Sequence, residues 1–92
     1  MILSRRVTDD GYEVIMEAVG CAKDDIAIQT RKDGTLNVTM KENAIYKERN
    51  RTFMYDTNVL DASKTKAKLE HGVLTLNVPF TEKQRSVKID VE

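Results

Sequence analysis

The residues that could carry catalytic or metal chemistry are few and lie far apart. His71 is the only histidine and Cys21 is the only cysteine. A zinc site needs a fuller set of histidine, cysteine or carboxylate ligands, so this pair predicts no metal centre. A catalytic thiol needs an activating base, and no histidine lies near Cys21 in the sequence. We interpret His71 as a turn residue and Cys21 as a turn thiol without catalytic role.

Two pairs of neighbouring carboxylates, Asp9-Asp10 and Asp24-Asp25, are the other candidates for acid–base chemistry. A general acid and base must face each other in different environments, whereas chain neighbours point apart and into water. We therefore interpret both pairs as solvated turn residues. The phosphate-binding motif GxxxxGK[ST] is also missing from the sequence. The sequence predicts no catalytic residue and no cofactor, which favours a binding or structural protein over an enzyme.

Composition narrows the class of protein further. The chain has 92 residues, the length of one domain, with 15 basic and 15 acidic residues and no tryptophan. A nucleic-acid-binding protein usually has a basic excess and stacking aromatics, so no nucleic-acid partner is predicted. No apolar run is long enough to span a membrane, and the N-terminus lacks a signal-peptide core. With a single cysteine, no internal disulfide forms, and these features together predict a cytoplasmic protein.

Alternation of apolar and polar residues, the period of a β-strand, dominates the chain. It predicts short strands at residues 12–18, 25–30, 35–41, 52–60, 65–70, 73–80 and 86–92. No convincing amphipathic helix is present. Many short strands in a chain of this length predict an all-β, antiparallel sandwich.

Turn residues mark the joints between these strands. Asp33-Gly34 and His71-Gly72 each separate two apolar, alternating segments, which is a strong signal for a hairpin. Residues 61–66 are predicted to form one helical turn capped by Asp61.

Residues 41–51 are polar and predict a solvated loop. Ala44-Ile45-Tyr46 forms an apolar island in this loop. Two interpretations stay open at this point. The island tucks a side chain onto its own sandwich, or it contacts another subunit.

The run "AKLEHGVL", residues 67–74, closely resembles the A-x-x-x-n-G-V-L signature of the α-crystallin domain of small heat-shock proteins, the Hsp20 family. The resemblance covers nearly the whole chain, from "GYEVIMEAVG" at residue 11 to a final Ile89-Asp90-Val91 similar to the family's I/V-x-I/V tail. The signature residues are Ala67, Gly72, Val73 and Leu74.

The resemblance implies an immunoglobulin-like β-sandwich at residues 1–80 and a short C-terminal extension at 81–92. It also implies that 65–70 is an edge strand, whose lysines guard against promiscuous pairing. In the family, a groove beside this edge accepts the tail of a neighbouring subunit. Here the tail anchors are Ile89 and Val91, and the groove residues are Ile26, Ile28, Ala67 and Leu69. In the alternative interpretation, residues 86–91 complete their own sheet.

The sequence departs from the family pattern at several positions. Val19-Gly20 replaces Pro-Gly, Tyr55 stands where the family has arginine, and Leu60 replaces a proline. The loop at 41–51 is short compared with relatives that swap a strand between subunits. We therefore expect a dimer that pairs edge to edge, through residues 52–60. The N-terminal arm is very short, as in a minimal member or a truncated chain.

The resemblance implies an ATP-independent holdase, a chaperone that binds unfolding proteins and suppresses their aggregation. Its partners would be further copies of itself, in oligomers built from dimers, and unfolded client proteins. Two alternatives remain at this stage. One is a p23-like co-chaperone domain, and the other is a structural sandwich without chaperone activity.

Overall fold

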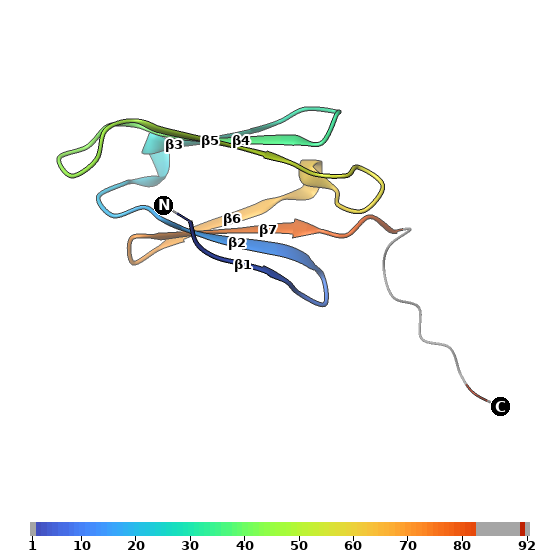
Figure 1. Ribbon diagram of the computed structural model, residues 1–92. Coiled ribbons are helices and arrows are strands. Elements are labelled where there is room, and N and C mark those ends of the chain that lie inside the picture. The colour runs from blue at the N-terminus through green and yellow to red at the C-terminus, as the bar shows by residue number, and fades with distance from the viewer. Residues whose placement is uncertain (1, 83–90, 92) are drawn as a thin grey trace.

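The computed structural model describes residues 2–82 and residue 91, and leaves 1, 83–90 and 92 undescribed. The described chain forms two stacked antiparallel sheets (Figure 1), which confirms the predicted sandwich. In chain order the elements are β1 (Ile2–Val7), β2 (Gly11–Glu17), η1 (Lys23–Asp25), β3 (Ile26–Thr30), β4 (Thr35–Met40), β5 (Arg49–Met54), η2 (Ala62–Lys64), β6 (Lys66–Glu70) and β7 (Val73–Pro79). None of the described helices is long and apolar enough to cross a membrane.

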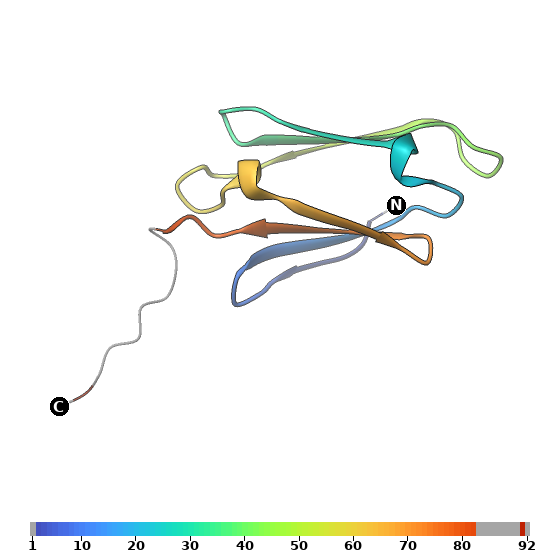
Figure 2. The same ribbon diagram turned by 180° about the vertical axis from the view of Figure 1, so that it is seen from behind.

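The order of strands puts four different strands at the edges. One sheet has the order β1-β2-β7-β6, and the other has the order β3-β4-β5. β6 and β3 lie on one side of the sandwich (Figure 2), and β1 and β5 lie on the other. The prediction that the lysine-rich strand is an edge is confirmed, because β6 pairs only with β7 among the described residues.

The core lies between the sheets and comes mainly from the central strands. Their alternate residues point inward because successive side chains of a strand leave opposite faces. The buried side chains of these strands are Val14, Met16, Leu36, Val38, Met40, Leu74, Leu76 and Val78. Each one stabilises the fold by about 1.5–3 kcal/mol relative to an exposed position.

Both predicted hairpins are present, and each depends on positive φ angles. Gly34 has φ of 92° in the turn between β3 and β4, which Arg31 N closes by donating to Thr35 O at 2.9 Å. His71 and Gly72 have φ of 52° and 74° and join β6 to β7 as a two-residue turn. Positive φ at both positions is what a type I′ hairpin turn requires.

The predicted helical turn is present as η2. Asp61 caps it, since its Oδ1 accepts a hydrogen bond from Ser63 N at 3.2 Å. A short polar side chain at this position satisfies a backbone donor that the helix cannot.

The strand predicted at 52–60 is wrong at both ends, because β5 covers Arg49–Met54. After Tyr55 the chain turns, and the Asp56 carbonyl accepts from Val59 N and Leu60 N at 2.9 Å each. Asp56 Oδ1 also accepts from Asn58 N at 2.9 Å, an Asx turn that competes with strand geometry. The loop between β4 and β5 is correspondingly shorter than predicted, at residues 41–48.

Strand β1 was not predicted from the sequence. Its residues do not alternate, and all but Ile2 are exposed. The register shifts between Ile2 and Ser4, so a bulge breaks the period-2 pattern. The strand forms because β2 offers it a free edge, which no local pattern reveals. The predicted strand at 86–92 lies outside the described residues apart from residue 91.

Replacing Gly34 by alanine is predicted to destabilise the fold more than replacing Gly72. Both glycines have positive φ, which costs an alanine about 1–2 kcal/mol. A Cβ on Gly34 would also lie 2.1 Å from the backbone oxygen of Tyr55, whereas on Gly72 its nearest contact is a Val19 side-chain atom at 3.3 Å. Urea unfolding at equal protein concentration measures both variants. Equal losses would contradict the role of the Gly34–Tyr55 approach.

Candidate functional site

The residues first considered for chemistry do not converge. The His71 side chain is 89% exposed, with Nε2 3.4 Å from a carboxylate oxygen of Glu70. Cys21 is half-buried and makes no disulfide. Within residues 2–82, no group of three His, Cys, Asp or Glu side chains could hold a metal ion.

Both carboxylate pairs lie in turns. Asp9 and Asp10 are exposed between β1 and β2, and Asp24 and Asp25 belong to η1. Asp25 Oδ2 accepts from Ala22 N at 2.9 Å, so this carboxylate caps the turn. The placement matches the interpretation of both pairs as turn residues.

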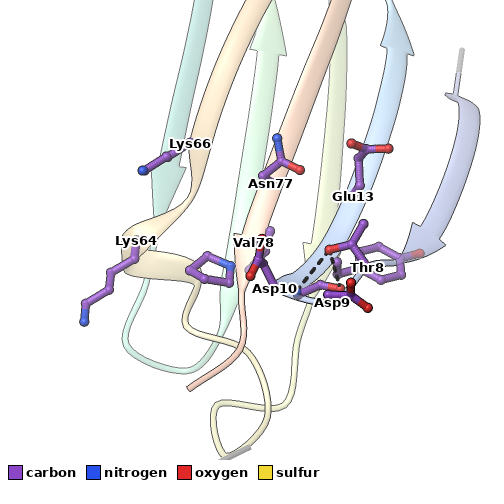
Figure 3. A pocket seen from close by; sticks show the side chains of 11 residues that line it. Thr8, Asp9, Asp10, Glu13, Lys64, Lys66, Asn77 and Val78 are labelled. Carbon is purple, nitrogen blue, oxygen red and sulfur yellow. Dashed lines mark hydrogen bonds between the residues drawn. The ribbon is translucent and has the colours of Figure 1, made fainter. Parts of the chain in front are cut away.

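An open pocket with a volume of about 680 Å³ lies on the outer face of the four-stranded sheet (Figure 3). Asp9, Asp10 and Glu13 line one side, and Lys64 and Lys66 line the other. The Glu13 carboxylate pairs with Arg6 Nε at 2.7 Å. The described lining residues include no histidine, no cysteine and none of the predicted groove residues.

The predicted groove residues come from two strands on one side of the sandwich. Ile26 and Ile28 are on β3, and Ala67 and Leu69 are on β6, and Figure 2 shows both strands on the near side. The two isoleucines and Leu69 are half-buried and pack against the core, while Ala67 is exposed. Partly covered apolar side chains therefore line the two sheet edges there.

The outer face of β6 is charged. Lys68 Nζ and Glu70 Oε2 are 2.8 Å apart. Their hydrogen bond raises the pKa of Lys68 and lowers the pKa of Glu70. Exposed ion pairs of this kind add little stability. Their effect is to keep charge on an edge that would otherwise invite pairing with another strand.

The signature residues all lie in the β6–β7 hairpin, where Ala67 is exposed on the edge strand β6. Gly72 provides the turn, Val73 begins β7, and the side chain of Leu74 is 2% exposed. In this chain the signature thus describes a hairpin whose second strand lies at the centre of its sheet. Of the two tail anchors, Ile89 lies outside the described residues and the Val91 side chain is 96% exposed.

The loop at residues 41–48 is tied to its own sandwich. The Asn43 side chain accepts from Ile45 N and Tyr46 N at 2.8 Å each, and donates to Val19 O at 3.2 Å. The Tyr46 hydroxyl donates to Glu17 Oε1 of β2. Tyr46 therefore contacts its own sandwich, as in the first of the two interpretations of this loop. Ile45 is 58% exposed.

Comparison with known proteins gives the family. A family model described as Hsp20/alpha crystallin matches residues 4–92. The chain belongs to this family. Its members are small heat-shock chaperones, which are generally not enzymes. The resemblance seen in the sequence at residues 67–74 is thereby confirmed.

Solved structures of small heat-shock proteins share the fold of this Hsp20 chain, and a plant relative matches part of it in sequence. The 22.0 kDa heat shock protein of Arabidopsis thaliana is 29% identical over 85 residues, which are 77% of this chain and 43% of the plant protein. The chain therefore spans less than half the length of that relative. A small heat-shock protein from Xylella fastidiosa superposes with a TM-score of 0.76 at 19% identity, covering 100% of this chain and 94% of the other. Heat shock protein 16.0 from Schizosaccharomyces pombe superposes with a TM-score of 0.69 at 21% identity. The match covers 100% of this chain and 82% of the yeast chain.

Tyr55, at the family's arginine position, has a role that the sequence did not predict. Its ring lies edge-on to Tyr12 at 5.8 Å and parallel to Phe53 at 6.2 Å. Its hydroxyl is buried without a hydrogen-bond partner among the described residues. Burial, with a smaller effect of Tyr12, raises the pKa of Tyr55 to about 12.

Removing this hydroxyl, in Tyr55→Phe, is predicted to stabilise the sandwich at neutral pH by about 1 kcal/mol, because a buried unpartnered group is lost. The wild type also loses stability between pH of about 10 and 12, since the unfolded tyrosine ionises near 10 and the folded one near 12. The Tyr55→Phe variant should lose less stability over the same pH range. Urea unfolding across pH measures both effects.

Tyr46→Phe is the matched control. It removes a hydroxyl that does have a partner, Glu17, so the variant should be less stable than wild type at neutral pH. If both variants shift stability in the same direction, the assignment of Tyr55 as an unpartnered hydroxyl is wrong.

Proposed function

We propose that this Hsp20 protein is an ATP-independent holdase of the cytoplasm that binds unfolding proteins during heat stress. Family membership over residues 4–92 is the observation that carries the proposal. A holdase lowers the free concentration of unfolded protein by mass action and so slows aggregation. It needs no nucleotide, which agrees with the missing phosphate-binding motif.

In the proposed assembly, each subunit has its sandwich at residues 1–80. The extension at 81–92 links that sandwich to a neighbouring subunit. In this arrangement Ile89 and Val91 of one subunit enter the groove of a neighbour, because residues two apart in an extended chain point to one side. The groove is the one formed by Ile26, Ile28, Ala67 and Leu69. Half-buried apolar side chains on two adjacent edges support such strand-edge recognition. The similar Xylella fastidiosa protein has a distinct high order structure.

The proposed dimer pairs edge to edge without exchanging the loop. The contacts of Asn43 and Tyr46 that hold residues 41–48 on their own sandwich support this. β5 is the candidate edge, with its bounds corrected to Arg49–Met54.

Replacing both tail anchors, Ile89→Ala with Val91→Ala, is predicted to shrink the assembly without unfolding the domain. Each anchor contributes about 1.5–3 kcal/mol by apolar burial, before the cost of ordering the tail. Multi-angle light scattering measures the mass, and far-UV circular dichroism checks the fold. Lys88→Ala with Asp90→Ala changes residues of the same tail that are not anchors in the proposed arrangement, and this variant should keep the mass. A double anchor variant with the parent's mass would exclude the tail as the link.

Aggregation of a heat-labile enzyme is predicted to fall when this protein is present at equimolar subunits without nucleotide. Light scattering during heating measures the effect, with an unrelated small β-sandwich protein at equal mass as control. Unchanged aggregation across several clients would favour a purely structural sandwich. Suppression only with ATP or with a second chaperone would favour a p23-like co-chaperone.

A further inference from the structure

The outer face of the three-stranded sheet carries no charged side chain on its strands. This sheet is one of the two layers in Figure 1, and the outward residues of β4 alternate with its buried Leu36, Val38 and Met40. The outward side chains of its three strands are amides and hydroxyls at Gln29, Thr35, Asn37, Thr39, Asn50 and Thr52, with Ala27 and Met54 as the apolar members. We call these outward residues of β3, β4 and β5 the neutral face.

The outer face of the four-stranded sheet has the opposite character. Arg6 and Glu13 form an ion pair there at 2.7 Å, and Lys68 and Glu70 form another at 2.8 Å. In this chain 33% of the residues are charged, so the neutral face is an exception. A charge is costly to remove from water unless it is fully paired. Of the two outer faces, the neutral face is therefore the one that a partner covers at low cost.

Four side chains of the neutral face bond to one another. Asn37 Nδ2 donates to Asn50 Oδ1 at 2.8 Å and to Thr52 Oγ1 at 2.9 Å. Asn50 Nδ2 donates to Thr39 Oγ1 at 3.3 Å, and Thr39 Oγ1 donates to Asn37 Oδ1 at 3.1 Å. Polar groups that keep their partners lose little when water is excluded, and such a network strengthens in a drier environment. Side chains that are already held in place also lose less entropy in a contact.

The chemistry of the neutral face suits an identical face. In a two-fold contact the same patch of both copies meets, so the patch must be complementary to itself. Amides and hydroxyls both donate and accept hydrogen bonds, and two uncharged faces do not repel each other. An unfolded client gains less here, because Ala27 and Met54 are the apolar residues on offer.

The size of the neutral face indicates how many copies the contact needs. Three strands about 4.8 Å apart and five residues long give a face of about 14 by 17 Å. Two such faces bury about 500 Å² in total, below the roughly 1,000 Å² of a specific interface. Antiparallel pairing through β5 would continue the sheet and put the neutral faces of both copies side by side. Two such dimers in contact bury about 1,000 Å².

We propose that two dimers of this chain, each paired through β5, stack on one another through their neutral faces. Arg31 borders the face in the β3–β4 turn and is exposed, so its charge lies at the rim of the contact, where interfaces are normally polar. The stacking is a contact separate from the tail and its groove. The inference rests on the proposed β5 dimer, and it does not depend on client binding.

The test uses the full chain with both tail anchors replaced, Ile89→Ala with Val91→Ala, so that the tail no longer links subunits. Multi-angle light scattering is expected to give a tetramer that separates into dimers on dilution. Adding Asn37→Lys puts a positive charge on every neutral face, and the mass is expected to fall to half. Thr75→Lys is the matched control, because Thr75 is also half-buried on the outer side of a central strand, β7. This variant should keep the tetramer.

An equimolar mixture of the Asn37→Lys and Asn37→Glu proteins is the second measurement. Opposite charges then meet across the contact, so the mixture is expected to regain the tetramer that each variant alone has lost. Misfolded chains would not recover in this way.

Three results would overturn the inference: a dimer at every concentration before Asn37 is changed, equal masses for Asn37→Lys and Thr75→Lys, or a mixture that stays dimeric. A monomer in the anchor variant would exclude the β5 dimer and the stacking together. If the anchor variant is only a dimer and client aggregation is still suppressed, the stacking fails and the holdase function stands.

Discussion

The pairing of β2 with β7 is the interaction on which the rest of the sandwich depends. Residues 11–17 and 73–79 pair in continuous register, although most of the chain lies between them. This pairing places the inward side chains of both strands beside one another, at the centre of the four-stranded sheet. It also leaves only the outer edges for β1 and β6, and so decides which strands are open to partners. Because these contacts are distant in sequence, the chain must close long loops to form them.

The two open sides of the sandwich are chemically distinct. On the β3/β6 side, lysines and a glutamate face outward while half-buried apolar residues line the gap. On the β1/β5 side, arginines stand beside methionines and an aromatic cluster that includes Phe53. A single fold thereby has a lysine-bearing edge at β6 and an arginine-bearing edge at β5.

Much of the candidate site was predictable, because its signals are local. Alternation placed Ile26 and Ile28 on one face of a strand, and the resemblance of residues 67–74 to the family signature implied that 65–70 is an edge. The position of three arginines beside the gap along β5 was not predictable. Arg5, Arg49 and Arg51 lie in segments without alternation, and β1 forms only because β2 has a free edge. Likewise, the sequence shows Tyr55 in place of the family's arginine, but it does not show that the Tyr55 ring packs against Tyr12 of β2 as well as against the nearby Phe53.

The sequence by itself determined the class of the fold, its hairpins and its family. A strand's period of two, the positive φ of Gly34 and Gly72, and the signature at 67–74 are properties of neighbouring residues. The tertiary structure alone decided the bounds of β5 and the presence of β1. It also decided that Arg49 and Arg51 line the gap along β5. β1 and β5 form by pairing with their neighbours β2 and β4, where packing and free backbone groups override local preference. The contact of Arg5 with Phe53 joins segments that lie far apart in the chain.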